Sequence, residues 1–124
     1  MDFENIINST DLTISSEIHK RKINDFLGII EGKLIFKNGT LDILEVIIVT
    51  DNQIFKKKYK YQLRSHTAEI IFRFDNAPHH QNVATYPHHK HLPDKIIEST
   101  EPDILQVLAE IKMLIKENDL ENLE

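Results

Sequence analysis

Five of the seven histidines lie within thirteen residues, in two short motifs that begin with proline. The motifs are Pro78-His79-His80 and, nine residues later, Pro87-His88-His89, which Lys90 and His91 follow. Imidazole exchanges protons near neutral pH and is also a common metal ligand. Because proline restricts the backbone around it, we expect the rings to be held on a preset scaffold. The motifs therefore predict a histidine site, although one or two of the rings could serve only to cap the loop.

Positive charge is concentrated in the same part of the chain. Between Lys56 and His91 there are seven Lys or Arg residues and two acidic ones, a net charge of +5, whereas the whole chain carries −5. A basic segment in an acidic protein predicts a local site for an anion rather than general adhesion to nucleic acid. An ordinary solvated surface is the alternative.

Imidazoles beside cations favour chemistry on a phosphodiester, with one histidine as base, another as acid, and Arg or Lys stabilising the developing charge. Zinc is the alternative, since the five histidines and Asp75 could supply three or four ligands. We favour metal-free chemistry and expect no cofactor, because the chain has no His-Glu-x-x-His motif and zinc would leave the cations unexplained. The candidate catalytic residues are Arg73, Asp75, His79, His80, His88, His89 and His91, and the candidate substrate-binding residues are Lys58, Lys60, Arg64 and Lys90.

The elements that must position these residues are predicted to be antiparallel strands. Asn38-Gly39 between two apolar runs is a strong hairpin signal, and Asp51-Asn52 offers a second turn. A weaker pattern predicts an edge strand over Leu12–Ile18 and a short helix over Phe3–Ile7. We expect a meander of four to five strands, with the clearest at Phe26–Lys37, Leu41–Thr50, Phe55–Arg64 and Glu69–Asp75.

Alternation along the last two strands separates an apolar face from a charged one. The apolar face would take Tyr59, Tyr61, Leu63, Ile70, Phe72 and Phe74, and the other would take Lys58, Lys60, Gln62, Arg64, Ile71, Arg73 and Asp75. A two-residue turn that pairs Ser65 with Ala68 would set Tyr61 opposite Phe72. It would also set Lys60 beside Arg73, on a charged face that leads directly into the histidines.

The remaining segments are a loop and a helix. Asn76–Asp94 has no periodicity and holds three of the four prolines, which predicts an ordered loop. Thr100-Glu101-Pro102-Asp103 predicts a capping box with proline in the first turn, followed by an amphipathic helix of about four turns. The expected fold is one α+β domain over residues 1–124, with the C-terminal helix packed on one face of the sheet.

Composition excludes several classes of protein. The chain has no cysteine, hence no disulfide and no thiol nucleophile, and three glycines do not make a phosphate-binding loop. Its longest apolar run is Val46–Val49, far below the roughly 20 residues that span a bilayer, and its first residues do not resemble a secretion signal. We expect a cytoplasmic protein without membrane association.

The histidine segment and its flanks resemble the TumE family of toxin components of prokaryotic toxin–antitoxin pairs. The resemblance is carried by Arg73-Phe74-Asp75-Asn76-Ala77-Pro78-His79-His80 and by Thr85-Tyr86-Pro87-His88-His89-Lys90-His91, with Tyr59-Lys60-Tyr61 before them and Glu98-Ser99 after. Where the family often has an aromatic residue preceded by histidine, this chain has Leu63 and Gln62. That departure leaves the loop histidines as the better catalytic candidates.

The resemblance implies a toxin that is neutralised by a cognate antitoxin with a DNA-binding domain. An RNA substrate is the expectation by analogy with other small antiparallel-sheet toxins. Two alternatives stay open: a toxin that binds or modifies a translation component without cutting RNA, and a histidine-rich metal-binding regulatory domain. The resemblance leaves both a monomer and a homodimer open.

Overall fold

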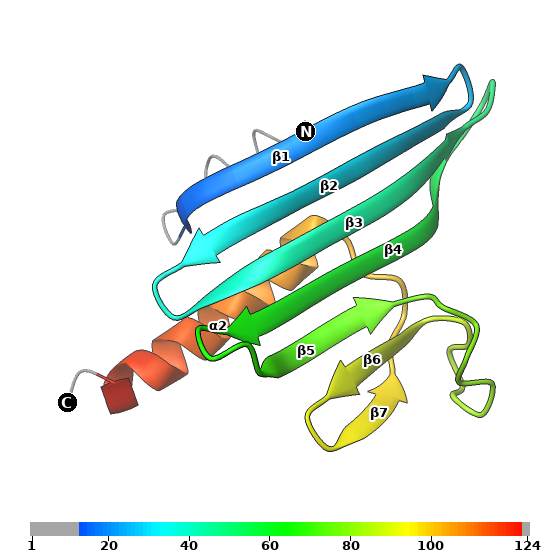
Figure 1. The fold of residues 1–124 in the computed structure, drawn as a ribbon. Coiled ribbons are helices and arrows are strands. Elements are labelled where there is room, and N and C mark those ends of the chain that lie inside the picture. Colours follow the sequence, from blue (N-terminus) through cyan, green and yellow to red (C-terminus); the bar gives the residue numbers. More distant parts are fainter. Residues whose placement is uncertain (1–12, 123–124) are drawn as a thin grey trace.

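The computed structural model describes residues 13–122, which form a seven-stranded antiparallel sheet and one helix (Figure 1). The strands lie side by side in the order in which they follow one another along the chain. They are β1 (Thr13–Asn24), β2 (Leu27–Phe36), β3 (Gly39–Val49), β4 (Ile54–Ser65), β5 (Ile70–Asp75), β6 (His89–Leu92) and β7 (Lys95–Glu98), and α2 (Ile104–Asn122) follows them. The predicted α+β meander is confirmed, while the predicted helix over Phe3–Ile7 lies outside the described residues.

The structure has more strands than the four to five that the sequence predicts. The additional strands β6 and β7 form a hairpin, and they lie at the end of the predicted loop and just beyond it. Local pattern does not identify β6, because His-Lys-His-Leu has little strand character of its own. It becomes a strand because its backbone pairs with β5 on one side and with β7 on the other.

The first predicted hairpin forms, but its turn lies one residue earlier than expected. Phe36 pairs with Gly39, so Lys37 and Asn38 are the two turn residues. Gly39 instead lies within the sheet, where a Cβ atom would stand 2.5 Å from the carbonyl oxygen of Arg64. The glycine is therefore required by the close approach of β4 and not by the turn.

The β4–β5 register differs by two residues from the predicted one. Tyr61 pairs with Phe74 rather than Phe72, and Lys60 pairs with Asp75 rather than Arg73. The cause is a wider turn, in which the N–H of Ser65 donates to the carbonyl oxygen of Glu69 and Ala68 adopts a φ of 68°. Because side chains alternate with a period of two, this shift leaves Arg73 and Asp75 on the charged face and Phe72 and Phe74 on the apolar face. The prediction is wrong at the start of β5, where an irregularity in the pairing leaves Ile70 exposed and packs Ile71 against the core.

The apolar face of the sheet packs against α2, which crosses behind the strands in Figure 1. Asp103 caps this helix, since its Oδ1 accepts the N–H of Gln106 at 2.8 Å and its own N–H donates to Gln106 Oε1 at 2.9 Å. The predicted capping box therefore lies three residues too early, and Pro102 precedes the helix instead of entering its first turn. The buried core is Leu34, Phe36, Leu41, Ile43, Tyr59, Tyr61, Leu63, Phe72, Phe74, Ile104, Val107, Leu108 and Ile111.

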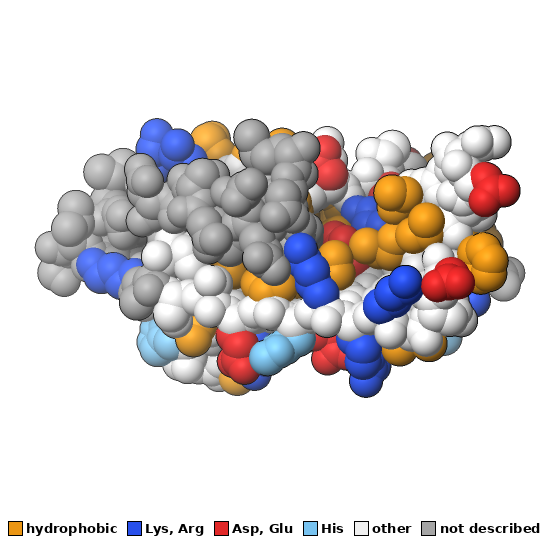
Figure 2. Space-filling view, turned by 90° about the horizontal axis from the view of Figure 1, so that it is seen from above, with side chains coloured by type: hydrophobic (Ala, Val, Ile, Leu, Met, Phe, Trp, Pro, Cys, Tyr) orange, Lys and Arg blue, Asp and Glu red, His pale blue; other side chains and the backbone are white. Residues whose placement is uncertain are grey.

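One end of the sheet exposes apolar side chains. Figure 2 looks at the molecule from above and shows hydrophobic atoms toward the end where Figure 1 places the β1–β2 turn. The exposed residues are Ile23, Phe26, Val49, Ile54 and Phe55. None of them lines the histidine pocket described below.

No helix in residues 13–122 is long and apolar enough to cross a membrane.

Candidate active site

Strands β5 and β6 bring four of the seven predicted catalytic residues onto the sheet face opposite α2. Arg73 pairs with His91, and Asp75 pairs with His89. Since paired residues point to the same face, these four side chains gather at the edge of the charged face. The predicted proximity of this face and the histidines is therefore confirmed, and the pairing of β5 with β6 is its cause.

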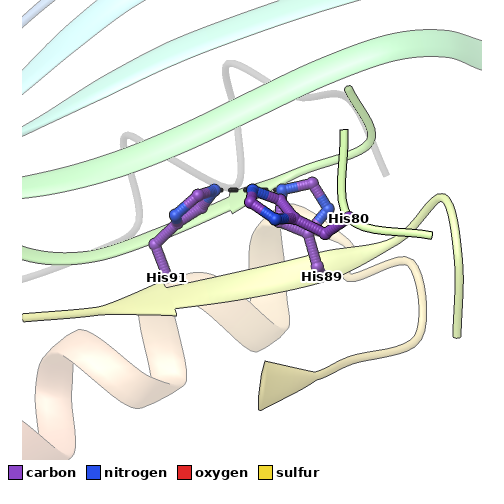
Figure 3. A group of neighbouring side chains, drawn as sticks. All are labelled: His80, His89 and His91. Atoms are coloured by element: carbon purple, nitrogen blue, oxygen red, sulfur yellow. Dashed lines mark hydrogen bonds between the residues drawn. The ribbon is translucent and has the colours of Figure 1, made fainter. Parts of the chain in front are cut away.

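Three imidazoles form a compact histidine cluster: His80, His89 and His91 (Figure 3). His89 and His91 project from β6, whereas His80 reaches them from the preceding loop. The ring centroid of His80 lies 4.9 Å from that of His89 and 5.3 Å from that of His91, in edge-to-face arrangements. One residue of the first Pro-His-His motif and one of the second thus meet at a single point, together with His91.

The buried carboxylate of Asp75 connects the cluster to the cationic side chains. Its Oδ1 accepts the N–H of Ala77 at 3.0 Å and lies 2.9 Å from His89 Nε2. Its Oδ2 accepts Arg73 Nε–H at 2.8 Å and lies 3.3 Å from His91 Nε2. Because Asp75 is only 6% exposed, this carboxylate holds its neighbours in one fixed arrangement.

Cations and imidazoles share one pocket of about 280 Å³. Lys58 and Lys60 reach it from β4, and Arg73 reaches it from β5. A larger and mainly apolar cavity of about 420 Å³ lies between the sheet and α2, but His66 is the one titratable residue among the side chains described around it. Of these two cavities, the smaller one gathers the titratable side chains and is the candidate active site; its lining is Leu44, Lys58, Tyr59, Lys60, Arg73, Asp75, Ala77, His79, His80, His89 and His91.

The electrostatics of the pocket favour a neutral imidazole at His91. Burial and the nearby Arg73 guanidinium lower the pKa of His91, and the Asp75 carboxylate opposes them in part. Arg73 Nη2 also donates to His91 Nε2 at 3.0 Å, which requires a lone pair on that nitrogen. A neutral histidine beside an arginine is suited to accept a proton from a substrate held by the arginine.

Asn76 and Thr85, which were not predicted as site residues, anchor the histidine segment to the backbone around it through hydrogen bonds. Asn76 Oδ1 accepts the N–H of Tyr59 at 3.0 Å, and its Nδ2 donates to the carbonyl oxygen of Lys57 at 3.0 Å. Thr85 Oγ1 donates to the carbonyl oxygen of His88 at 2.6 Å and accepts the N–H of Ser99 at 2.8 Å. Both residues lie within the two segments that carry the family resemblance. Asn and Thr commonly form hydrogen bonds to nearby backbone, so their position there could have identified them.

Three predicted site residues do not line the pocket. His88 Nδ1 lies 2.9 Å from the Tyr59 hydroxyl, against whose ring the imidazole also stacks. Arg64 forms an ion pair with Asp42 at 2.7 Å. Lys90 points to the opposite side of the sheet, since it alternates with His89 and His91, and it pairs there with Glu110 of α2.

Comparison with known proteins agrees with the resemblance that the motifs indicate. The family model described as Toxin TumE matches residues 3–118, which is nearly the whole chain. The curated proteins and the solved structures gave no match. The matched residues include both Pro-His-His motifs and all the strands that build the pocket. The chain therefore belongs to the TumE family of toxins.

Proposed function

We propose that this toxin is a ribonuclease that cleaves RNA in the histidine pocket by acid–base catalysis without a metal ion. One observation carries the proposal: Lys58, Lys60 and Arg73 line the same pocket as imidazoles from both Pro-His-His motifs. The cations attract and neutralise a phosphodiester, and the imidazoles supply proton transfer near neutral pH. Activity on a neutral substrate would leave this concentration of positive charge without a role.

The reaction begins when a phosphate of the RNA binds Arg73. The phosphate competes with His91 for the guanidinium, so its arrival frees the Nε2 lone pair of His91. His91 then accepts the proton of the 2′-hydroxyl, and the 2′ oxygen attacks phosphorus. The bond from phosphorus to the 5′ oxygen breaks, and that oxygen receives a proton from an imidazolium, a role we give to His80 because it comes from the other motif. The products are a 2′,3′-cyclic phosphate and a 5′-hydroxyl end.

The cationic side chains stabilise the extra negative charge that phosphorus acquires during the attack. Asp75 aligns Arg73 through its Nε, which leaves the outer nitrogen of the guanidinium toward His91 and the pocket. Lys58 is exposed and Lys60 half-buried, so they meet the flanking phosphates at the pocket rim. A preorganised donor such as Arg73 contributes about 10²–10³-fold in rate.

A toxin implies a cognate antitoxin, and we expect one with a DNA-binding domain that neutralises the toxin by direct contact in the cytoplasm. Induction of the toxin alone should slow or stop bacterial growth, and new RNA ends should appear within minutes. Co-expression of the adjacent gene should restore growth. Normal growth at confirmed soluble expression would contradict the toxic role, and intact RNA during growth arrest would favour a toxin that binds or modifies a translation component.

A further inference from the structure

The hydrogen atoms of His89 are constrained by its neighbours. Its Nδ1 lies 2.9 Å from the carbonyl oxygen of Pro87, which can only accept, so Nδ1 carries the hydrogen. In the neutral ring, Nε2 is then a bare lone pair. That atom lies 2.9 Å from Asp75 Oδ1 and 3.0 Å from His91 Nε2, which already accepts from Arg73.

The Nε2 atom of His89, a side chain that is only 2% exposed, thus faces two further electron-pair donors, Asp75 Oδ1 and His91 Nε2. Facing lone pairs repel and water has little access here, so a positive charge among the three atoms would stabilise this arrangement. A proton on His89 is one such charge, and it is compatible with the proton transfers that His91 and His80 perform in the proposed function. A metal cation is the other, and the two exclude each other at the same nitrogen.

The separations suit a metal ion. Two donor atoms of a tetrahedral zinc site lie about 3.3 Å apart, because each is about 2.0–2.1 Å from the ion. His89 Nε2 and His91 Nε2 are 3.0 Å apart, and a donor nitrogen of His80 completes a set in which all three lie within 4.8 Å of one another. The hydrogen bond from His89 Nδ1 to a carbonyl is the outer contact that orients imidazole ligands toward a metal.

We propose that His80, His89 and His91 bind one divalent transition-metal ion of the zinc class, and that this ion switches off the toxin. The inhibitory part rests on the proposed function, since an imidazole whose lone pair binds a metal cannot accept or deliver a proton there. Asp75 balances the charge of the ion at close range. Arg73 opposes binding, because its guanidinium occupies the lone pair of His91 and is itself positive.

Binding is measured on the full chain without reference to activity. After treatment with EDTA and dialysis, titration with Co²⁺ should give the visible absorption bands of a tetrahedral site, with one ion per chain, and Zn²⁺ should displace them. His80→Ala and His91→Ala should each weaken binding by more than the roughly 10–100-fold that loss of an outer contact costs. His79→Ala is the matched control, because this exposed neighbour in the same loop lies outside the cluster and should bind Co²⁺ like the unmodified chain.

Arg73→Gln distinguishes a site in the cluster from an adventitious one. Removal of the competing cation should tighten Co²⁺ binding, although the same change impairs the proposed catalysis. Circular dichroism of each variant shows that it is folded. Equal affinity in the unmodified chain, His80→Ala and His91→Ala, or more than one ion per chain without tetrahedral bands, would overturn the metal site.

The effect on activity is a separate result. RNA cleavage should fall in proportion to the Zn²⁺ bound and should return when EDTA is added. A rise in cleavage with bound Zn²⁺ would overturn the inhibition and also the metal-free mechanism, while the binding site would stand. A chain that binds Co²⁺ through the cluster but cuts no RNA under any condition would overturn the proposed function alone.

Discussion

His91→Ala and His80→Ala should each lower the rate of RNA cleavage by about 10²–10⁴-fold, the usual contribution of a general acid or base. Burial and Arg73 lower the pKa of His91, which contacts the guanidinium that would hold the phosphate, and His80 reaches the same pocket from the first Pro-His-His motif. The rate of a defined oligonucleotide's cleavage, at saturating and at low substrate, measures the effect. A loss in kcat with little change in KM is expected for a group that acts on the transition state.

His66→Ala is the control for these variants. His66 is an exposed histidine in the β4–β5 turn and lies outside the pocket, so its loss should leave the rate unchanged. Equal rates for His80→Ala, His91→Ala and His66→Ala would contradict acid–base catalysis by imidazoles in this pocket. The histidine cluster would then have a role in binding only.

Arg73→Ala should abolish toxicity and lower cleavage by about 10²–10³-fold, because it removes a preorganised charge at the phosphate. The fold should persist, since Asp75 keeps its contacts to Ala77 and His89 when the guanidinium is gone. Arg73→Lys should recover only part of the activity, because an ammonium group cannot bond to Asp75 and a phosphate with the planar fork of arginine. Cleavage assays beside urea unfolding separate the two effects.

Phe72→Ala is the counterpart on the other face of β5. Phe72 is 1% exposed within the core, so its truncation should lower the free energy of unfolding by about 3–5 kcal/mol. Urea unfolding followed by circular dichroism measures the loss. If Arg73→Ala unfolded the chain and Phe72→Ala did not, the assignment of the two faces would be wrong, and the pocket with it.

The charged face was predictable because it depends only on alternation along a strand. Arg73 and Asp75 had to share a side whatever their partners, and a two-residue change of register preserved that side. The register itself was not predictable, because it depends on a wide turn in which Ala68 has a positive φ. Glycine usually occupies such positions, and the sequence has none there. Register is a property of the turn geometry and of the partner strand together.

The histidine motifs marked the site, but their geometry arises from a strand that has no local signal. Because His89, Lys90 and His91 alternate within β6, two histidines enter the pocket while Lys90 turns to Glu110 on the opposite side. The prediction of one loop over Asn76–Asp94 could not distinguish the direction of these histidines from that of Lys90. Asn76 and Thr85 were missed for a related reason, since side chains that bond to backbone are recognised only when the backbone path is known.

The central claim is that the histidine pocket cuts RNA by proton transfer alone, and the chemical nature of the RNA ends tests it most directly. Purified full-length toxin, incubated with RNA in excess EDTA, should produce fragments that end in a 2′,3′-cyclic phosphate or its 3′-phosphate product and begin with a 5′-hydroxyl. Arg73→Ala, purified in parallel, should produce these fragments about 10²–10³-fold more slowly. Cleavage that stops in EDTA and returns with added metal, or fragments that begin with a 5′-phosphate, would contradict the mechanism.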